Sequence, residues 1–70
     1  MKNMKIEINE QQPIEDVVDI LGDKGYVLTF KPTDKPVFVT TNEKGGAGFF
    51  DFVPSDTYFT LTTLAELKEM

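Results

Sequence analysis

The segment from Pro13 to Asp23 places the tightest constraint on how this chain can fold. It reads PIEDVVDILGD, and its apolar residues recur at the three- and four-residue intervals that put side chains on one side of a helix. Pro13 suits the first helical position, because its φ is already helical and its missing N–H would have had no partner there. Gly22 can adopt the left-handed conformation that ends a helix. We therefore expect an amphipathic helix whose buried side is formed by Ile14, Val17, Val18 and Leu21.

The opposite side of this helix is acidic, with Glu15, Asp16, Asp19 and Asp23 pointing away from the apolar residues. Asp16, Asp19 and Asp23 are neighbours on the helix surface, where like charges repel by roughly 0.2–0.5 kcal/mol per pair. At a rise of about 1.5 Å per residue the charges come roughly every 3–4 Å, close to the spacing of about 3.4 Å between phosphates along one DNA strand. A solvated surface is the simpler interpretation, and a partner that recognises phosphates is the functional one.

The net charge of −5 is concentrated around this helix. Residues 1–23 hold two lysines against six acids, a net of −4, whereas residues 24–70 hold five lysines against six acids, a net of −1. Such a field opposes binding to nucleic acid or to anionic membranes and favours a basic partner.

Histidine and cysteine are both absent, which removes disulfides, thiolate metal sites and the commonest general base. The chain also has no calcium-loop motif, no apolar run near 18 residues and no signal-peptide pattern. Ser55 has no base to activate it, and a possible carboxylate pair of Asp51 and Asp56 would lack a cleft in a chain of 70 residues. We expect a cytoplasmic protein that is not an enzyme and needs no metal or cofactor.

Alternation of apolar and polar residues predicts the strands. In residues 2–9, Met4, Ile6 and Ile8 share the face expected to be buried, and Lys5 lies on the other face. Residues 33–41 or the strand at Tyr58 would offer an exposed sheet edge, to which a partner could add a strand. Three further strands and one short extended run are expected at 26–31, 37–41, 49–53 and 57–59.

A second helix is predicted near the end of the sequence. Thr60 or Thr63 can cap it, and Thr63 and Glu66 have the spacing of a capping box. It is short enough to fray unless it docks on the sheet. The predicted fold is α+β, a single domain over 1–70 in the order β-α-β-β-β-α, with a mostly antiparallel meander and the helices packed on one face. The apolar side of this second helix is expected to comprise Leu61, Leu64 and Leu67.

The glycine-rich segment 42–48 leads into a strand and lacks the Lys-Ser/Thr of a phosphate-binding loop, so we expect a flexible hairpin loop. The run Gly48-Phe49-Phe50-Asp51-Phe52 resembles the end of the aromatic octapeptide of RRM domains, which implies binding of single-stranded nucleic acid. In this sequence, a glycine occupies the position of the basic residue of that motif, and an alanine occupies one of its aromatic positions. The simpler interpretation is that Phe50 and Phe52 point into the core while Phe49 faces outward.

In its small size, its acidic first helix and its lack of His, Cys and Trp, the chain resembles the acidic DNA-mimic proteins with which bacteriophages disable host factors. Among these it is most similar to the Bacillus phage inhibitors of the nucleoid protein HU. The resemblance implies a monomer or homodimer that occupies the DNA-binding saddle of an HU-like dimer in the bacterial cytoplasm, without contacting nucleic acid or membrane. An adaptor that uses a sheet edge or an aromatic patch, and the RRM-like binder, are the alternatives. The expected partner-binding residues are Glu10, Glu15, Asp16, Asp19 and Asp23, with Glu43, Asp51 and Asp56 as a second row.

Overall fold

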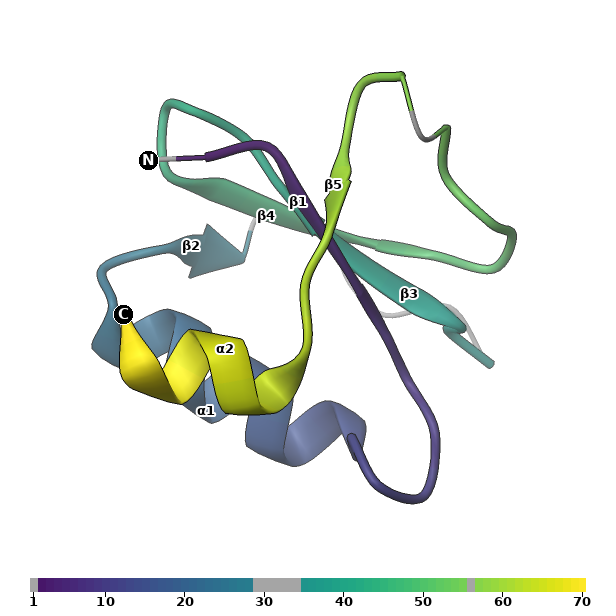
Figure 1. Cartoon of the computed structure of the whole chain (residues 1–70), viewed down its shortest axis with the longest axis horizontal. Coiled ribbons are helices and arrows are strands. Elements are labelled where there is room, and N and C mark those ends of the chain that lie inside the picture. Colours follow the sequence, from purple (N-terminus) through teal and green to yellow (C-terminus); the bar gives the residue numbers. More distant parts are fainter. Residues whose placement is uncertain (1, 29–34, 56) are drawn as a thin grey trace.

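The computed structural model describes residues 2–28, 35–55 and 57–70. In these residues the chain forms a five-stranded sheet with two helices packed side by side on one face (Figure 1). This confirms the α+β class and the placement of both helices on the same face. The elements follow in the order β1 (Met4–Glu7), α1 (Ile14–Asp23), β2 (Val27–Leu28), β3 (Phe38–Thr41), β4 (Gly46–Phe50), β5 (Thr60–Leu61) and α2 (Leu64–Glu69).

The sheet is mixed, and its strand order is β2-β4-β3-β1-β5. The β1–β3 and β3–β4 pairs are antiparallel, whereas the β1–β5 and β2–β4 pairs are parallel. The predicted meander order is therefore wrong and the sheet is mixed, although most of its paired residues are antiparallel, as predicted, and the β3–β4 hairpin is present. Two connections explain the difference: α1 carries the chain past β3 and β4 to reach β2, and the segment after β4 crosses the sheet to the far side of β1. Each of these connections joins two strands that run in the same direction, so each is a crossover and not a hairpin.

The main core lies between the sheet and the helices. Residues directly opposite each other on paired strands point to the same face, so Ile6, Val39 and Phe49 all project toward the helices. Val17 and Leu21 of α1 are fully buried against them, as predicted. Ile14 and Val18 are only partly buried, and Ile20, which was not predicted on the apolar side, packs against this core. The buried cluster comprises Met4, Ile6, Val17, Leu21, Tyr26, Val39, Ala47, Leu64 and Leu67.

Helix α1 begins and ends slightly differently from the prediction. Pro13 has an extended backbone and occupies the N-cap, so the helix starts at Ile14. Gly22 is within the helix, and the residue with a left-handed backbone is Gly25, at φ 93°. The backbone N–H of Tyr26 then donates to the carbonyl of Leu21 at 3.0 Å, which closes the end of the helix. The prediction that Gly22 terminates the helix is therefore wrong, because the chain remains helical through Asp23 before it reverses.

Helix α2 has the predicted capping box. The Thr63 hydroxyl accepts from the Glu66 backbone N–H at 3.1 Å, and the Glu66 carboxylate accepts from the Thr63 backbone N–H at 3.0 Å. Leu64 and Leu67 are buried, so this short helix is docked on the core. Leu61, expected on the same apolar side, is instead an exposed residue of β5. It remains extended because the flanking residues pair with β1.

The β3–β4 connection is shorter than predicted. It is a tight turn over residues 42–45, and Gly46, Ala47 and Gly48 already belong to β4. The Asn42 side-chain oxygen accepts from two backbone N–H groups of the turn, at 2.9 and 3.0 Å, and Gly45 takes a positive φ of 88°. The predicted flexible loop is therefore wrong, because hydrogen bonds to the Asn42 side chain hold these residues in a tight turn.

Of two further predicted strands, one is present and the other is displaced. The strand expected at 26–31 is present as β2, and positions 29–31 lie outside the described residues. The extended run expected at 57–59 falls partly in a turn, and the chain pairs with β1 only from Thr60 onward.

The face of the sheet away from the helices, which we call the outer face, is partly covered by the segment that follows β4 (Figure 1). Lys5 was expected to be solvated there, but it is only 3% exposed. Its Nζ donates to the Pro54 carbonyl at 3.0 Å and lies 6.0 Å from the centroid of the Phe38 ring. Lys5 therefore joins the sheet to the covering segment.

The orientation predicted for the phenylalanines of β4 is reversed. Phe50 pairs with Phe38 and lies on the outer face, whereas Phe49 pairs with Val39 and packs against the helix-side core. Phe52 is exposed and its ring lies beside that of Phe50. The prediction failed because it assumed a single apolar face, whereas the segment after β4 supplies aromatic rings to the second face as well.

Candidate protein-binding surfaces

Four carboxylates form a stripe along the solvent side of α1, which we call the acidic stripe: Glu15, Asp16, Asp19 and Asp23. At 3.6 residues per turn they fall within an arc of about 100°, opposite the buried Val17 and Leu21. All four side chains are exposed. The stripe covers eight residue steps, which is about 12 Å along the helix axis.

No described residue forms an ion pair with these four carboxylates. The last turn of α1 contains no basic residue. Lys24, which follows directly, donates its Nζ to the backbone carbonyl of Met70 at the end of α2. Glu15 and Asp16 are in the first turn, where the helix dipole stabilises a carboxylate by about 0.3–1 kcal/mol. The negative charge of the stripe is therefore presented to solvent without a neutralising cation among the described residues.

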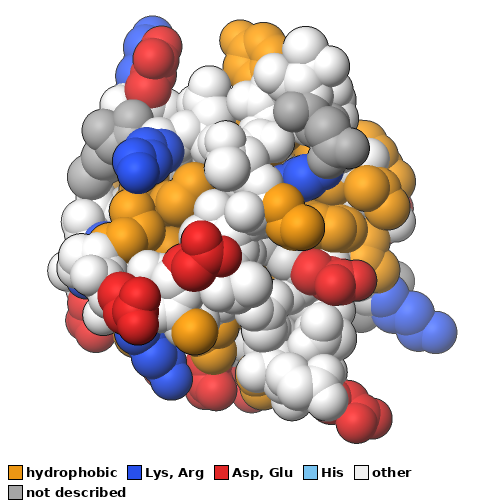
Figure 2. All heavy atoms as spheres, viewed as in Figure 1, with side chains coloured by type: hydrophobic (Ala, Val, Ile, Leu, Met, Phe, Trp, Pro, Cys, Tyr) orange, Lys and Arg blue, Asp and Glu red, His pale blue; other side chains and the backbone are white. Residues whose placement is uncertain are grey.

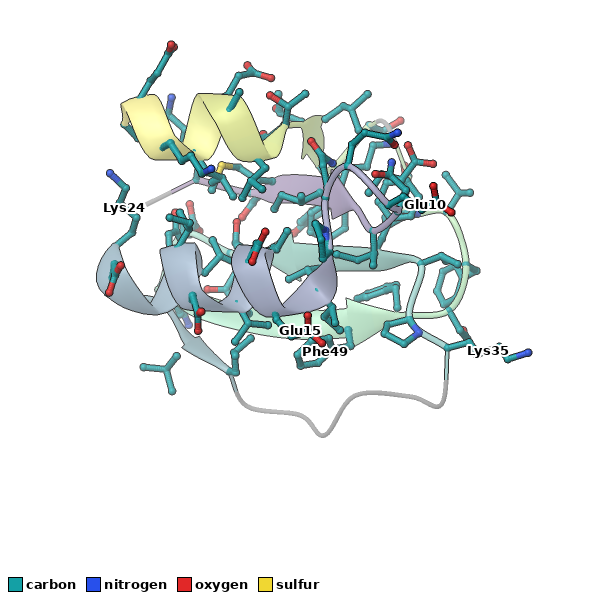
Figure 3. All side chains as sticks on the ribbon, turned by 90° about the horizontal axis from the view of Figure 1, so that it is seen from below. Glu10, Glu15, Lys24, Lys35 and Phe49 are labelled. Carbon is teal, nitrogen blue, oxygen red and sulfur yellow. The ribbon has the colours of Figure 1, made fainter. Side chains whose placement is uncertain are left out.

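Glu10 lies on the turn between β1 and α1, beyond the amino-terminal end of the helix that carries Glu15 (Figure 3). The Asn9 side chain fixes this turn by accepting from two backbone N–H groups, at 2.8 and 3.0 Å. Gln12 then ties the start of α1 to two other elements, since its amide donates to the Glu7 carbonyl at 2.7 Å and accepts from the first N–H of α2 at 2.8 Å. Sequence reasoning missed Gln12, because nothing in its local pattern indicates a partner 52 residues away.

The three acids predicted to form a second row are not brought together among the described residues. Glu43 is exposed on the turn before β4, and Asp51 is exposed directly after β4. They therefore lie at opposite ends of one strand. Asp56, one of the two carboxylates considered as a catalytic pair, lies outside the described residues.

The outer face carries a run of aromatic rings. Phe52, Phe50, Phe59 and Tyr58 follow one another with centroid separations of 5.0, 6.3 and 5.6 Å. The two inner rings are half-buried, whereas Phe52 and Tyr58 are 59% and 70% exposed. Figure 2 shows hydrophobic side chains gathered on the side of the molecule where the segment after β4 lies. We define the aromatic patch as the exposed apolar residues on and beside this segment: Phe52, Val53, Tyr58 and Leu61.

The sheet edges formed by the described residues are small. The prediction of an exposed sheet edge over 33–41 is wrong for β3, because this strand lies between β4 and β1 in the sheet. Positions 33 and 34 are outside the described residues. The outermost described strands are β2 and β5, with two residues each. They offer few free backbone groups for strand addition.

The described residues contain no group of three or more His, Cys, Asp or Glu side chains placed to hold a metal ion. They also contain no helix that is both long and apolar enough to cross a membrane. Ser55 is exposed, and its hydroxyl accepts from the Thr57 backbone N–H at 3.1 Å. No protein-family model, curated protein or solved structure matches the chain.

Proposed function

We propose that this protein binds a basic DNA-binding protein, with an HU-like dimer as the favoured partner, and blocks the surface that would contact DNA. The acidic stripe would meet lysine and arginine side chains of the partner in place of phosphates, with Glu10 extending the contact beyond the end of α1. The observation that carries the proposal is the set of four exposed carboxylates on one side of α1, none of which forms an ion pair with a described residue.

The spacing of the stripe supports this proposal. Four charges over about 12 Å give one charge per roughly 4 Å, compared with one phosphate per about 3.4 Å along a DNA strand. The helix that presents them is fixed by the burial of Val17 and Leu21 and by the hydrogen bonds of Gln12. Little conformational entropy would be lost from its backbone on binding, which favours affinity.

Binding of this kind has a characteristic salt dependence. Long-range attraction between an acidic stripe and a basic surface accelerates association and weakens as ionic strength rises. An adaptor that uses the aromatic patch would instead bind through apolar contact, which salt does not screen. Comparing affinities at two salt concentrations therefore separates these two functions.

The test is a competition in which a purified bacterial HU dimer is bound to a fluorescent DNA duplex and the protein is titrated in. We expect displacement of the duplex at low salt and a loss of displacement at high salt. The substitutions Glu15→Gln, Asp16→Asn and Asp19→Asn made together should abolish displacement. They should leave the fold intact, because the relief of like-charge repulsion, roughly 0.2–0.5 kcal/mol per pair, offsets the lost interaction of Glu15 and Asp16 with the helix dipole, about 0.3–1 kcal/mol each.

A charge-matched control distinguishes the stripe from net charge alone. The substitutions Glu7→Gln and Glu69→Lys change the net charge by the same three units, at exposed positions in two other elements of the fold. This control should displace DNA almost as well as the unmodified protein. Equal loss of displacement in the control and in the α1 variant, or full activity of the α1 variant, would remove the acidic stripe from the mechanism.

The RRM-like alternative has one specific observation in its favour, since Phe50 and Phe52 lie on the face away from the helices, where bases could stack. Lys5 is the basic residue at the centre of that face, but it is buried and engaged with Pro54. The net charge of −5 also opposes phosphate contact. Binding of the protein to fluorescent single-stranded DNA or RNA alone would favour this alternative over the DNA mimic.

A further inference from the structure

The aromatic patch is large for a chain of this size. Phe52, Val53, Tyr58 and Leu61 are between 59% and 70% exposed. A phenylalanine or tyrosine side chain carries about 150–250 Å² of surface, so the four residues together expose on the order of 500 Å². The largest apolar patch on an ordinary monomer is about 300–600 Å² and is often functional. The aromatic patch is at the upper part of that range on a protein of only 70 residues.

We propose that the aromatic patch is the interface of a homodimer, in which a second copy of this chain packs its own patch against the first. Two such patches meeting about a two-fold axis would bury roughly 1,000 Å² in total, which is the threshold for a specific interface of modest strength. Aromatic residues are also enriched at the centres of such interfaces. The half-buried rings of Phe50 and Phe59 would form the floor on which the exposed residues of the partner copy pack.

The distribution of charge favours a second copy as the occupant. A net charge of −5 per chain disfavours self-association unless the acidic surfaces remain apart. The acidic stripe is on α1, which covers one face of the sheet, and the aromatic patch is associated with the outer face. The shortest dimension of the molecule is 20 Å. Two copies joined through their outer faces would therefore hold their acidic stripes several Debye lengths apart, since this length is about 8–10 Å at physiological salt.

Sedimentation equilibrium of the untagged protein tests the proposal. Between about 5 and 500 µM, a range that spans the dissociation constants of modest interfaces, the mass should rise from 7.9 kDa toward twice that value. Because the contact is apolar, the dimer should persist at high salt. A monomer mass over the whole range would overturn the proposal.

Two variants localise the contact. Phe52→Ser combined with Tyr58→Ser should reduce dimerisation at least tenfold. Val27→Ser is the matched control, because Val27 is 63% exposed but lies on β2, at the opposite edge of the sheet from β5. It should dimerise like the unmodified protein. The reverse pattern, or equal behaviour of the two variants, would place the contact elsewhere and overturn the proposal.

If the double variant does not fold, a dilution series of amide NMR spectra of the unmodified protein tests the same contact. Concentration-dependent shifts should occur at Phe52, Val53, Tyr58 and Leu61 and be absent from α1. Shifts confined to α1 or β2 would contradict the proposed surface. Because none of these measurements uses a basic partner or the acidic stripe, the dimer can fail without affecting the proposed function, and the converse also holds.

Discussion

The two glycines at the end of α1 provide a sharp test of how this helix is built, because substituting them with alanine should change stability in opposite directions. Gly22 is an exposed helical residue, and a Cβ added there would meet nothing within 4 Å. Gly25 follows the helix with a φ of 93°, in the region that residues with a Cβ rarely adopt.

The magnitudes follow from these two backbone states. Alanine in a helix is more stable than glycine by about 0.5–1 kcal/mol, chiefly because glycine loses more conformational freedom on folding. With no steric cost to offset it, Gly22→Ala should raise the free energy of unfolding by about that amount. Gly25→Ala should lower it by about 1–2 kcal/mol, the cost of a left-handed backbone for an L-residue with a Cβ. In a domain of this size 1 kcal/mol corresponds to roughly 4–8 °C in Tm.

Urea denaturation followed by far-ultraviolet circular dichroism, with thermal melts of the same samples, measures both changes. The two variants serve as controls for each other, since the chemical substitution is the same and the positions are three residues apart. If Gly22→Ala destabilised the protein and Gly25→Ala did not, the left-handed residue would be Gly22. The helix would then end before Asp23, and the acidic stripe would lose its last carboxylate from the helical surface.

Two further predictions concern the contacts that hold the remaining elements in place. Thr63→Ala removes the capping box of α2 and should cost about 1 kcal/mol in urea denaturation, whereas Thr63→Ser should cost much less; equal effects would show that the hydroxyl is not responsible. Lys5→Met keeps most of the buried side-chain volume but removes the donor to the Pro54 carbonyl, so we expect a loss of about 1–3 kcal/mol and faster hydrogen exchange in the segment after β4. An increase in stability would instead mean that the desolvation free energy of the buried ammonium group exceeds the stabilisation from its contacts.

Local patterns in the sequence were sufficient to predict the helices. The apolar spacing of Val17 and Leu21 fixed the buried side of α1, and the Thr63–Glu66 spacing fixed the start of α2. Both signals act over a few residues, so no tertiary information was needed to interpret them.

The arrangement of the sheet could not be predicted in this way. Which strands pair depends on the paths of the connections, and the parallel pairing of β1 with β5 joins segments about 56 residues apart. The hydrogen bond from the Leu64 backbone N–H to the Gln12 side chain, which connects the start of α1 to α2, is non-local for the same reason. Lys5 was misassigned because a charged residue in an alternating strand ordinarily faces water, and its burial is made acceptable by non-local contacts such as the hydrogen bond to the carbonyl of Pro54, 49 residues away.

The burial of Lys5 also bears on how the two candidate surfaces are kept distinct. A sheet with one solvated face would need polar residues on that face, yet Phe38 and Phe50 occupy it. The segment after β4 covers them and, in doing so, exposes Phe52 and Tyr58. The helices cover the other face, and α1 presents the acidic stripe to solvent. The aromatic patch and the acidic stripe therefore belong to opposite layers of the fold, so that contact through the patch does not require desolvating the carboxylates of the stripe.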